Sequence, residues 1–170
     1  SFPEQLERTL NDYGQPTRVI QAGFDGYTTE NAVQIIEGIL DRNPDIDLVI
    51  FIFGGNDYFQ QVPTEITRRN MDRMLKIITD REIPTLLAGL IIPFDGYLGY
   101  SNRLNDVYTE LADKYEVTLD PFFLEGVAGV PELNQPDKIH PNKFGNRVIA
   151  NRVSTIVGEM LAKMDQYDRV

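Results

Sequence analysis

The chain has 170 residues, of which 42% are hydrophobic and 25% are charged, with a formal net charge of −10 and a pI of about 4.5. This composition is typical of a globular domain, and its negative charge argues against nucleic acid as a partner because a phosphate backbone would be repelled. The absence of cysteine excludes disulfides, thiolate metal sites and a cysteine nucleophile, and no apolar run reaches the ~20 residues of a membrane span.

Apolar residues near the N-terminus change from helical to strand spacing. Phe2, Leu6 and Leu10 recur at every fourth position and predict a short helix that ends near Gly14. Residues 17–23, TRVIQAG, form a short apolar run rich in β-branched residues and predict a strand. A helix followed by a strand is therefore expected within the first 23 residues.

The following segments repeat this alternation of helix and strand. Thr28 or Thr29 can cap a helix whose buried stripe includes Val33 and Leu40. The run 47–55, DLVIFIFGG, is apolar without alternation, which is typical of a central parallel strand covered on both faces. The remaining expected elements, in chain order, are a helix over 64–80, a strand over 83–92, a helix around 104–111, a strand over 117–123 and a helix after Pro141.

Strands that alternate with helices indicate a parallel sheet. We expect one domain over residues 1–170 with an α/β fold, a three-layer α/β/α, flavodoxin-like, doubly wound parallel sheet. Ligands of such sheets bind beyond the carboxyl ends of the strands. Functional residues are therefore sought in the segments that leave those ends, which are 23–29, 54–60, 93–102 and 136–142.

The segment 136–142, PDKIHPN, contains the only histidine of the chain. A histidine can act as a general base near neutral pH, and it does so best when a carboxylate fixes its tautomer. The spacing D-x-x-H can place Asp137 and His140 on one face of a turn, although an exposed histidine in a polar loop is the usual alternative. One histidine and no cysteine leave only oxygen ligands, so we expect no metal site.

Two other strand ends offer neutral hydrogen-bond donors. Asn56 in GGNDYF follows the run 47–55, and its side-chain amide can stabilise a developing oxyanion. Gly26 in GFDGYTT lies between a strand and a helix start, where its backbone N–H can play the same role. Each segment read alone also fits an ordinary turn. The signals gain weight because all three predicted segments leave the same edge of the sheet.

Together these motifs resemble the SGNH (GDSL-type) hydrolases, in particular their bacterial arylesterase, thioesterase I and lysophospholipase L1 group. VIQAGFDGYTTENAV (19–33) is similar to the second block of that family, GGND (54–57) to the third and DKIH (137–140) to the fifth. The resemblance extends over essentially all of the chain, and two ordered motifs at the family's spacing are more specific than either alone.

The resemblance implies a serine esterase that hydrolyses short or medium acyl esters or thioesters without a cofactor. In that family a serine attacks the carbonyl, and the resemblance assigns the base to His140 and the orienting acid to Asp137. It assigns the oxyanion hole to the backbone N–H of Gly26 and the side-chain amide of Asn56. The acyl group is expected to contact the residues that leave the third predicted strand, Ile91, Ile92, Pro93 and Phe94.

One feature of the family has no counterpart in the chain. Its first block, a central strand that ends in Gly-Asp-Ser, precedes a stretch like SFPEQLERTL, with which this chain begins. None of Ser1, Ser101 and Ser154 has the strand-to-helix setting that the family's nucleophile requires, since Ser101 lies in a loop rich in Gly and Tyr and Ser154 lies within a predicted helix. We therefore expect that the chain is N-terminally incomplete, that it lacks the central strand and that it is inactive for want of the nucleophile.

Two alternatives to an esterase come from other functional classes. The first is a non-catalytic module that binds a small molecule and has lost the serine. The second is a flavodoxin-like nucleotide-binding domain, which is disfavoured because no glycine-rich phosphate loop follows a predicted strand. The resemblance is compatible with a periplasmic or secreted location, but the sequence leaves the compartment, the acyl length and the oligomeric state open.

Overall fold

The computed structural model describes residues 1–91 and 99–167, which form two compact units. The first unit consists of Ser1–Gln21 and Leu124–Val170, and the second consists of Ala22–Phe123. Among the described residues, no helix combines the length and the apolar character needed to cross a membrane.

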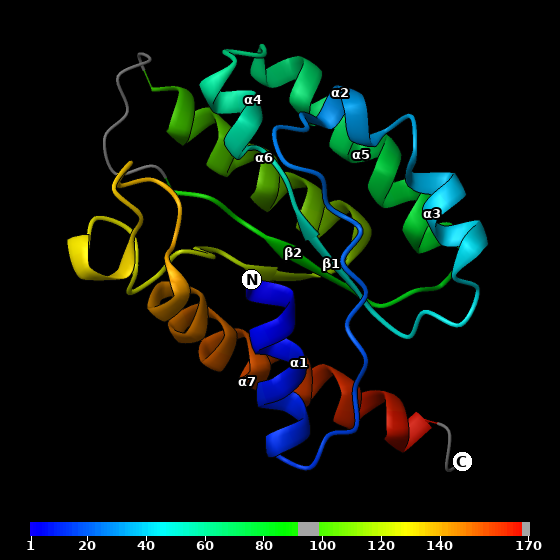
Figure 1. The fold of residues 1–170 in the computed structure, drawn as a ribbon. Coiled ribbons are helices and arrows are strands. Elements are labelled where there is room, and N and C mark those ends of the chain that lie inside the picture. Colours follow the sequence, from blue (N-terminus) through cyan, green and yellow to red (C-terminus); the bar gives the residue numbers. More distant parts are fainter. Residues whose placement is uncertain (92–98, 168–170) are drawn as a thin grey trace. The chain divides into compact units, whose positions relative to one another are not determined.

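The first unit is built on a pair of helices. Its elements are α1 (Phe2–Asp12), the short 3-10 helix η1 (Pro131–Leu133) and α7 (Lys143–Tyr167). Helix α1 packs against α7, as Figure 1 shows. Of the apolar stripe predicted for α1, Leu6 and Leu10 are buried and Phe2 is partly buried. Ile149 and Val153 of α7 are buried as well.

The second unit contains a parallel sheet with strand order β1-β2-β3. The strands are β1 (Val49–Ile52), β2 (Thr85–Ala88) and β3 (Thr118–Asp120). The helices of this unit lie on one side of the sheet in Figure 1. They are α2 (Thr29–Ala32), α3 (Ile36–Arg42), α4 (Gly55–Phe59), α5 (Thr64–Asp80) and α6 (Tyr100–Tyr115).

The core of the second unit joins the middle of the sheet to α5 and α6. Phe51 of β1 stands opposite Leu87 of β2, and both are buried. Met74 of α5 and Leu104 of α6 have no exposed surface and belong to the same cluster. Each such side chain contributes about 1.5–3 kcal/mol by leaving water, so this cluster holds the strand ends and the segments that leave them.

The α/β fold class and the parallel sheet are confirmed. The helix predicted over 64–80 is α5 with the same bounds, and Thr28 is the N-cap of α2 as expected. The strands predicted over 47–55, 83–92 and 117–123 are present as the shorter β1, β2 and β3.

The strand predicted over residues 17–23 is wrong, because these residues form no strand. The side chains of α1 satisfy the backbone groups that a sheet partner would otherwise bind. The Asn11 side chain donates to Thr17 O at 2.8 Å and accepts from Thr17 N at 3.1 Å, and Val19 N donates to Glu7 Oε2 at 2.6 Å. These bonds occupy backbone groups of Thr17 and Val19, and the sheet of the described residues offers residues 17–23 no partner strand. The β propensity of the run, which reflects packing in a sheet, is therefore not realised.

Two helices also depart from prediction. The single helix expected from Thr28 onward is interrupted by a turn at residues 33–35, which separates α2 from α3. Val33 and Ile35 are β-branched, and such residues lower helix propensity. The segment GGNDYF was expected to be a turn, whereas Gly55–Phe59 forms the short helix α4 directly after β1.

Candidate active site

The loop that carries His140 lies in the first unit, between η1 and α7. It is closed at its base by an isolated antiparallel bridge between Asn134 and Pro141. Gln135 N donates to His140 O at 2.8 Å and Lys138 N donates to Gln135 O at 2.8 Å, so the loop is a tight reversal. Lys138 has a φ of 60°, in the left-handed region that non-glycine residues rarely adopt.

Asp137 and His140 contact each other across this reversal. The Asp137 Oδ2 atom lies 2.7 Å from His140 Nδ1. The other carboxylate oxygen, Oδ1, accepts from the backbone N–H groups of Ile139 at 3.0 Å and His140 at 3.1 Å. One carboxylate therefore shapes the loop and orients the imidazole, as the sequence predicts for an acid–base pair.

The charge of Asp137 determines which ring nitrogen of His140 carries the proton of their hydrogen bond. The hydrogen bond with His140, and then the backbone hydrogen bonds from Ile139 and His140, lower the pKa of Asp137 from 3.8 to about 2. The carboxylate is ionised at neutral pH and can only accept, so Nδ1 carries the proton in this hydrogen bond. The Nε2 atom of a neutral His140 is then left as an acceptor. The His140 side chain is 64% exposed, so a reacting group can approach it.

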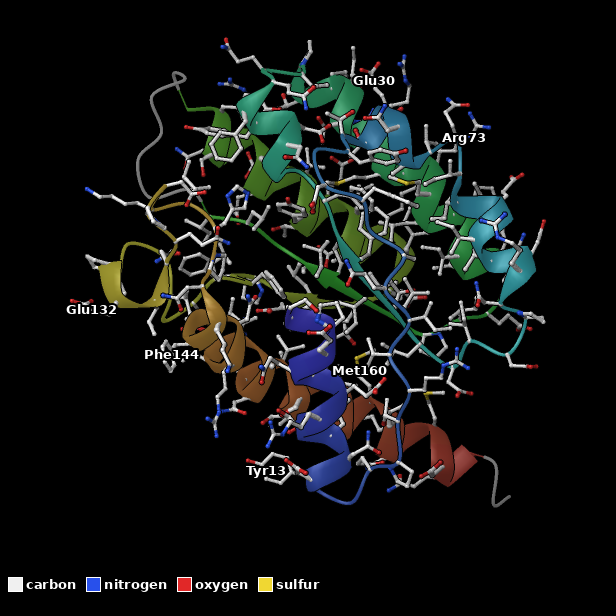
Figure 2. All side chains as sticks on the ribbon, viewed as in Figure 1. Tyr13, Glu30, Arg73, Glu132, Phe144 and Met160 are labelled. Atoms are coloured by element: carbon white, nitrogen blue, oxygen red, sulfur yellow. The ribbon has the colours of Figure 1, made fainter. Side chains whose placement is uncertain are left out.

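Asn142 joins the loop to the start of α7. Its Oδ1 accepts from Phe144 N at 2.8 Å and Gly145 N at 3.1 Å, which caps two N–H groups that the first helical turn leaves unpaired. Its Nδ2 donates to Glu132 O at 2.8 Å and to Asn134 O at 3.1 Å. Glu132 and Phe144, labelled in Figure 2, mark the elements on either side of the loop. One side chain thus ties η1, the loop and α7 together.

The two predicted oxyanion donors lie next to each other in the second unit. Asn56, in the first turn of α4, donates from Nδ2 to Tyr27 O at 2.9 Å. Gln60, just beyond α4, donates from Nε2 to Gly26 O at 3.2 Å. Gly26 has a φ of 77°, which glycine adopts without strain. Within the described part of the chain, the Gly26 N–H donates no hydrogen bond.

The backbone before Asn56 is held by a buried tyrosine. Tyr108 of α6 donates from its hydroxyl to Phe53 O, and burial raises the pKa of Tyr108, which keeps it protonated as a donor. Gly54 follows with a φ of 114°, and a Cβ at this position would overlap the Tyr108 hydroxyl. Glycine is therefore required where the chain turns from β1 into α4.

Asp57 is a residue of this region to which the sequence analysis assigned no function. Its side chain is fully buried, and its carboxylate accepts from Thr29 N at 3.0 Å, from Thr29 Oγ1 at 2.6 Å and from Thr67 Oγ1 at 2.9 Å. The sequence did offer a signal for this role. The aspartate directly follows the predicted oxyanion asparagine, and threonines lie in the neighbouring predicted helices. This signal could not be used because the sequence does not show which helix starts face each other.

Of the four residues predicted to contact the acyl group, the structure describes one. Ile91 follows β2 and is 40% exposed, while Ile92, Pro93 and Phe94 lie outside the described residues. The structure therefore brings together two pairs of predicted residues. Asp137 and His140 form one pair in the first unit, and Gly26 and Asn56 form the other in the second unit.

None of the serines is exposed at the end of a strand. Ser1 is the N-cap of α1, and its amino group pairs with Glu4 at 2.9 Å. Ser101 is buried in the first turn of α6. Ser154 is buried within α7 and donates to Asn151 O at 2.7 Å. These settings differ from the exposed strand-to-helix turn that presents a serine nucleophile in hydrolases.

The chain is similar in sequence and in structure to proteins that are named as esterases. The model of the GDSL-like Lipase/Acylhydrolase family matches residues 1–148. The arylesterase of Vibrio mimicus is 31% identical over 154 residues, which cover 91% of this chain and 76% of that protein. The thioesterase 1/protease 1/lysophospholipase L1 of Escherichia coli K12 is 28% identical over 143 residues, or 84% of this chain and 68% of that protein. The crystal structure of AlinE4, an SGNH-hydrolase family esterase, matches with a TM-score of 0.77 at 36% identity and covers 95% of this chain and 86% of that one.

Proposed function

This chain belongs to the GDSL-like lipase/acylhydrolase family, and from that premise we propose that it carries the acid, the base and two oxyanion donors of a serine esterase. Its substrates are short or medium acyl esters or thioesters. The names of its relatives, an arylesterase and a thioesterase/lysophospholipase, support this substrate class. The observation that carries the proposal is the 2.7 Å contact between Asp137 Oδ2 and His140 Nδ1 in the family's fifth block.

The acid–base chemistry follows from the tautomer of His140. With Nδ1–H held by Asp137, the neutral imidazole accepts the nucleophile's proton at Nε2 and later returns it to the leaving alcohol or thiol. The imidazolium that forms is stabilised by the Asp137 carboxylate, which stays ionised because its pKa is about 2. Orientation costs little at the moment of reaction, since two backbone N–H groups already hold that carboxylate.

The oxyanion is stabilised by Gly26 and Asn56. The Asn56 amide has two N–H groups, of which one is bonded to Tyr27 O, so the second donates to the oxygen of the tetrahedral intermediate. The Gly26 N–H is the other donor. Removal of one such donor in an acyl-transfer site costs about 10²–10³ in kcat. The acyl group contacts Ile91 and the residues that follow it, as the sequence analysis predicts.

The nucleophile in this proposal is a serine from outside the 170 residues. The N-cap position of Ser1 and the burial of Ser101 and Ser154 support this assignment. In the family's order, that serine ends the strand that lies between residues 17–23 and β1. The chain by itself then provides a base without a nucleophile.

The test compares the 170-residue chain with an extended form, in which the chain follows a strand that ends in Gly-Asp-Ser. The chain should hydrolyse p-nitrophenyl acetate no faster than its H140A variant and should resist a fluorophosphonate label. The extended form should hydrolyse the ester and take the label at the added serine. Its H140A variant should be slower by about 10² or more, the contribution of a general base.

Three outcomes separate the proposal from its alternatives. Stoichiometric labelling of Ser101 or Ser1 would show that the nucleophile is within the chain. An extended form that takes no label and hydrolyses neither an ester nor a thioester would favour the non-catalytic binding module. Equal activity of the extended form and its H140A variant would refute the role of His140.

A further inference from the structure

The carboxylate of Asp57 is buried in the second unit with neutral partners only. Its side chain has no exposed surface, and no ion pair is formed with it among the residues that the structure describes. A buried carboxylate is costly unless hydrogen bonds replace the water that it loses. Three donors do so here, and two of them come from one residue, Thr29. The largest share of this carboxylate's bonding is therefore directed at the segment that follows Gly26.

Asn56 and Asp57, neighbours at the start of α4, bind the same short segment with opposite polarity. The Asn56 side chain donates to Tyr27 O, while the Asp57 side chain accepts from Thr29 N and Thr29 Oγ1. A slip of the segment by one residue would break these backbone contacts and move the Thr29 hydroxyl away from the carboxylate. The two side chains therefore determine the register of residues 27–29 against α4.

The far side of Asp57 is anchored to α5. Thr67 Oγ1 donates to Asp57 Oδ1 at 2.9 Å, and Asn70 Nδ2 donates to Thr29 Oγ1 at 3.2 Å. Thr29 and Thr67 have no exposed surface, and Asn70 is buried. The carboxylate is thus the centre of a polar cluster that joins α2, α4 and α5, and the core around Met74 makes α5 a firm support.

We infer that Asp57 is a positioning residue whose buried carboxylate fixes the spacing between the Gly26 N–H and the Asn56 side-chain amide. Gly26 is one residue before Tyr27, so the backbone that Asn56 and Asp57 hold also aims the Gly26 N–H. Preorganised donors stabilise an oxyanion far better than donors that must reorient. The inference rests on the proposed function, which makes Gly26 and Asn56 the oxyanion donors.

The chemistry explains why an aspartate rather than an asparagine suits this position. Both carboxylate oxygens accept, which serves the three donors of Thr29 and Thr67. An asparagine has the same size but one accepting oxygen, and its NH2 group would face a donor. The D57N variant therefore keeps the size of the side chain but replaces one of the two accepting oxygens by a donor, so that at least one hydrogen bond from Thr29 or Thr67 is lost.

The first experiment uses NMR of the 15N-labelled 170-residue chain. It follows the backbone amide of Gly26 and the side-chain amide of Asn56, neither of which bonds to Asp57. In D57N both signals should shift, and exchange of the Asn56 amide hydrogens should be faster by about tenfold, as expected when a local contact opens. The T85V variant is the matched control, because Thr85 is also buried in the same unit and its hydroxyl bonds, among the described residues, to Ile83 O alone, at 3.0 Å. T85V should leave both signals in place.

A second variant keeps the test decisive where D57N does not fold. T29V keeps the β-branched shape and the backbone N–H but removes the hydroxyl that donates to Asp57 and accepts from Asn70. It should shift the same two signals in the same direction. Unchanged Gly26 and Asn56 signals in a folded D57N or T29V chain would overturn the inference.

The second experiment separates this inference from the proposed function. In the extended form, D57N should lower kcat by about tenfold or more with KM changed by less than about threefold, because the donors act on the transition state. Shifted signals in a protein that never hydrolyses esters would leave the positioning role standing and refute the proposed function. Full kcat in a folded D57N enzyme would refute the positioning role while the esterase stands.

Discussion

At the scale of single residues, the central feature is a carboxylate that serves the loop and the imidazole together. Asp137 uses one oxygen for two backbone N–H groups and the other for His140 Nδ1. The shape of the loop and the charge of the pair are therefore linked. Removal of the ring changes the pKa of the carboxylate, and loss of the carboxylate removes the hydrogen bonds that hold the backbone N–H groups of Ile139 and His140.

This linkage predicts a change in titration when the imidazole is removed. In H140A, the pKa of Asp137 should rise from about 2 toward 3.8, because the hydrogen bond with His140 is the largest cause of its lowering. It should stay below 3.8, since the backbone N–H groups still bond to Oδ1. The carboxyl 13C shift of Asp137 during an acid titration measures this, and a midpoint still at about 2 would show that the backbone alone sets the pKa.

The same pKa predicts where the pair stabilises the fold. The folded-state pKa of Asp137 is lower than its unfolded value, so the ionised carboxylate stabilises the protein fully above the unfolded pKa of 3.8. That contribution is lost as pH falls from 3.8 through about 2. The gap in unfolding free energy between the wild type and D137N should therefore shrink across this window. A gap that grows on acidification would contradict the sign of the linkage.

At the scale of elements, the placement of the His140 loop depends on how closely η1 approaches α7. Gly145 lies in the first turn of α7, and a Cβ there would overlap Leu133 O and lie 3.0 Å from Val127 Cγ1. The obstacle is backbone, which cannot rotate away. Gly158 in the same helix has nothing within 4 Å of the equivalent Cβ position.

Alanine at these two glycines should therefore have opposite effects. G158A should stabilise the protein by about 0.5–1 kcal/mol, since alanine favours a helix interior over glycine. G145A gains the same propensity but must push η1 away, with a net loss of about 1–3 kcal/mol, typical of overpacking. Urea unfolding of both variants measures the difference, and G145A as stable as G158A would mean that η1 moves freely.

The elements also show which features a sequence reveals. Helix α5 was predicted with its observed bounds because its pattern is long, and the apolar runs that became β1, β2 and β3 pair with one another in the sheet. The run 17–23 has a similar composition, yet Asn11 and Glu7 bind its backbone. Such side-chain-to-backbone bonds depend on the path of the chain, which composition does not encode. Helix α4 was not predicted, because glycine and asparagine are common in turns. In the structure Gly54, Gly55 and Asn56 instead form the start of this helix.

At the scale of the whole molecule, the predicted site divides into what is local in sequence and what is not. Asp137 and His140 are three residues apart, so spacing alone predicted their contact. Asn56 was placed by the rule that functional segments leave the ends of strands, and it follows β1 directly. The same rule placed Gly26, although the strand predicted before it is absent. The two segments are nevertheless bonded to each other. Asp57 and Asn142 were not predicted to have a role, because their partners Thr29, Thr67 and Glu132 are distant in sequence or are backbone groups. A motif thus identifies the reacting groups more readily than the residues that hold them.

We predict that residues 1–170 form one domain in which the Asp137–His140 pair and the Gly26–Asn56 pair converge on a single site. A serine esterase requires this, since the base and the oxyanion donors act on one carbonyl group. The chain has no cysteine, so one nitroxide label can be attached at K143C, at the exposed first residue of α7. This label should strongly broaden the Gly26 amide and the Asn56 side-chain amide in NMR spectra, relative to the reduced label. A label at Y13C, which is exposed just beyond α1 and lies away from Phe144 in Figure 2, should broaden them far less. Sharp Gly26 and Asn56 signals with the Lys143 label would place the two pairs at separate sites and refute the proposed esterase.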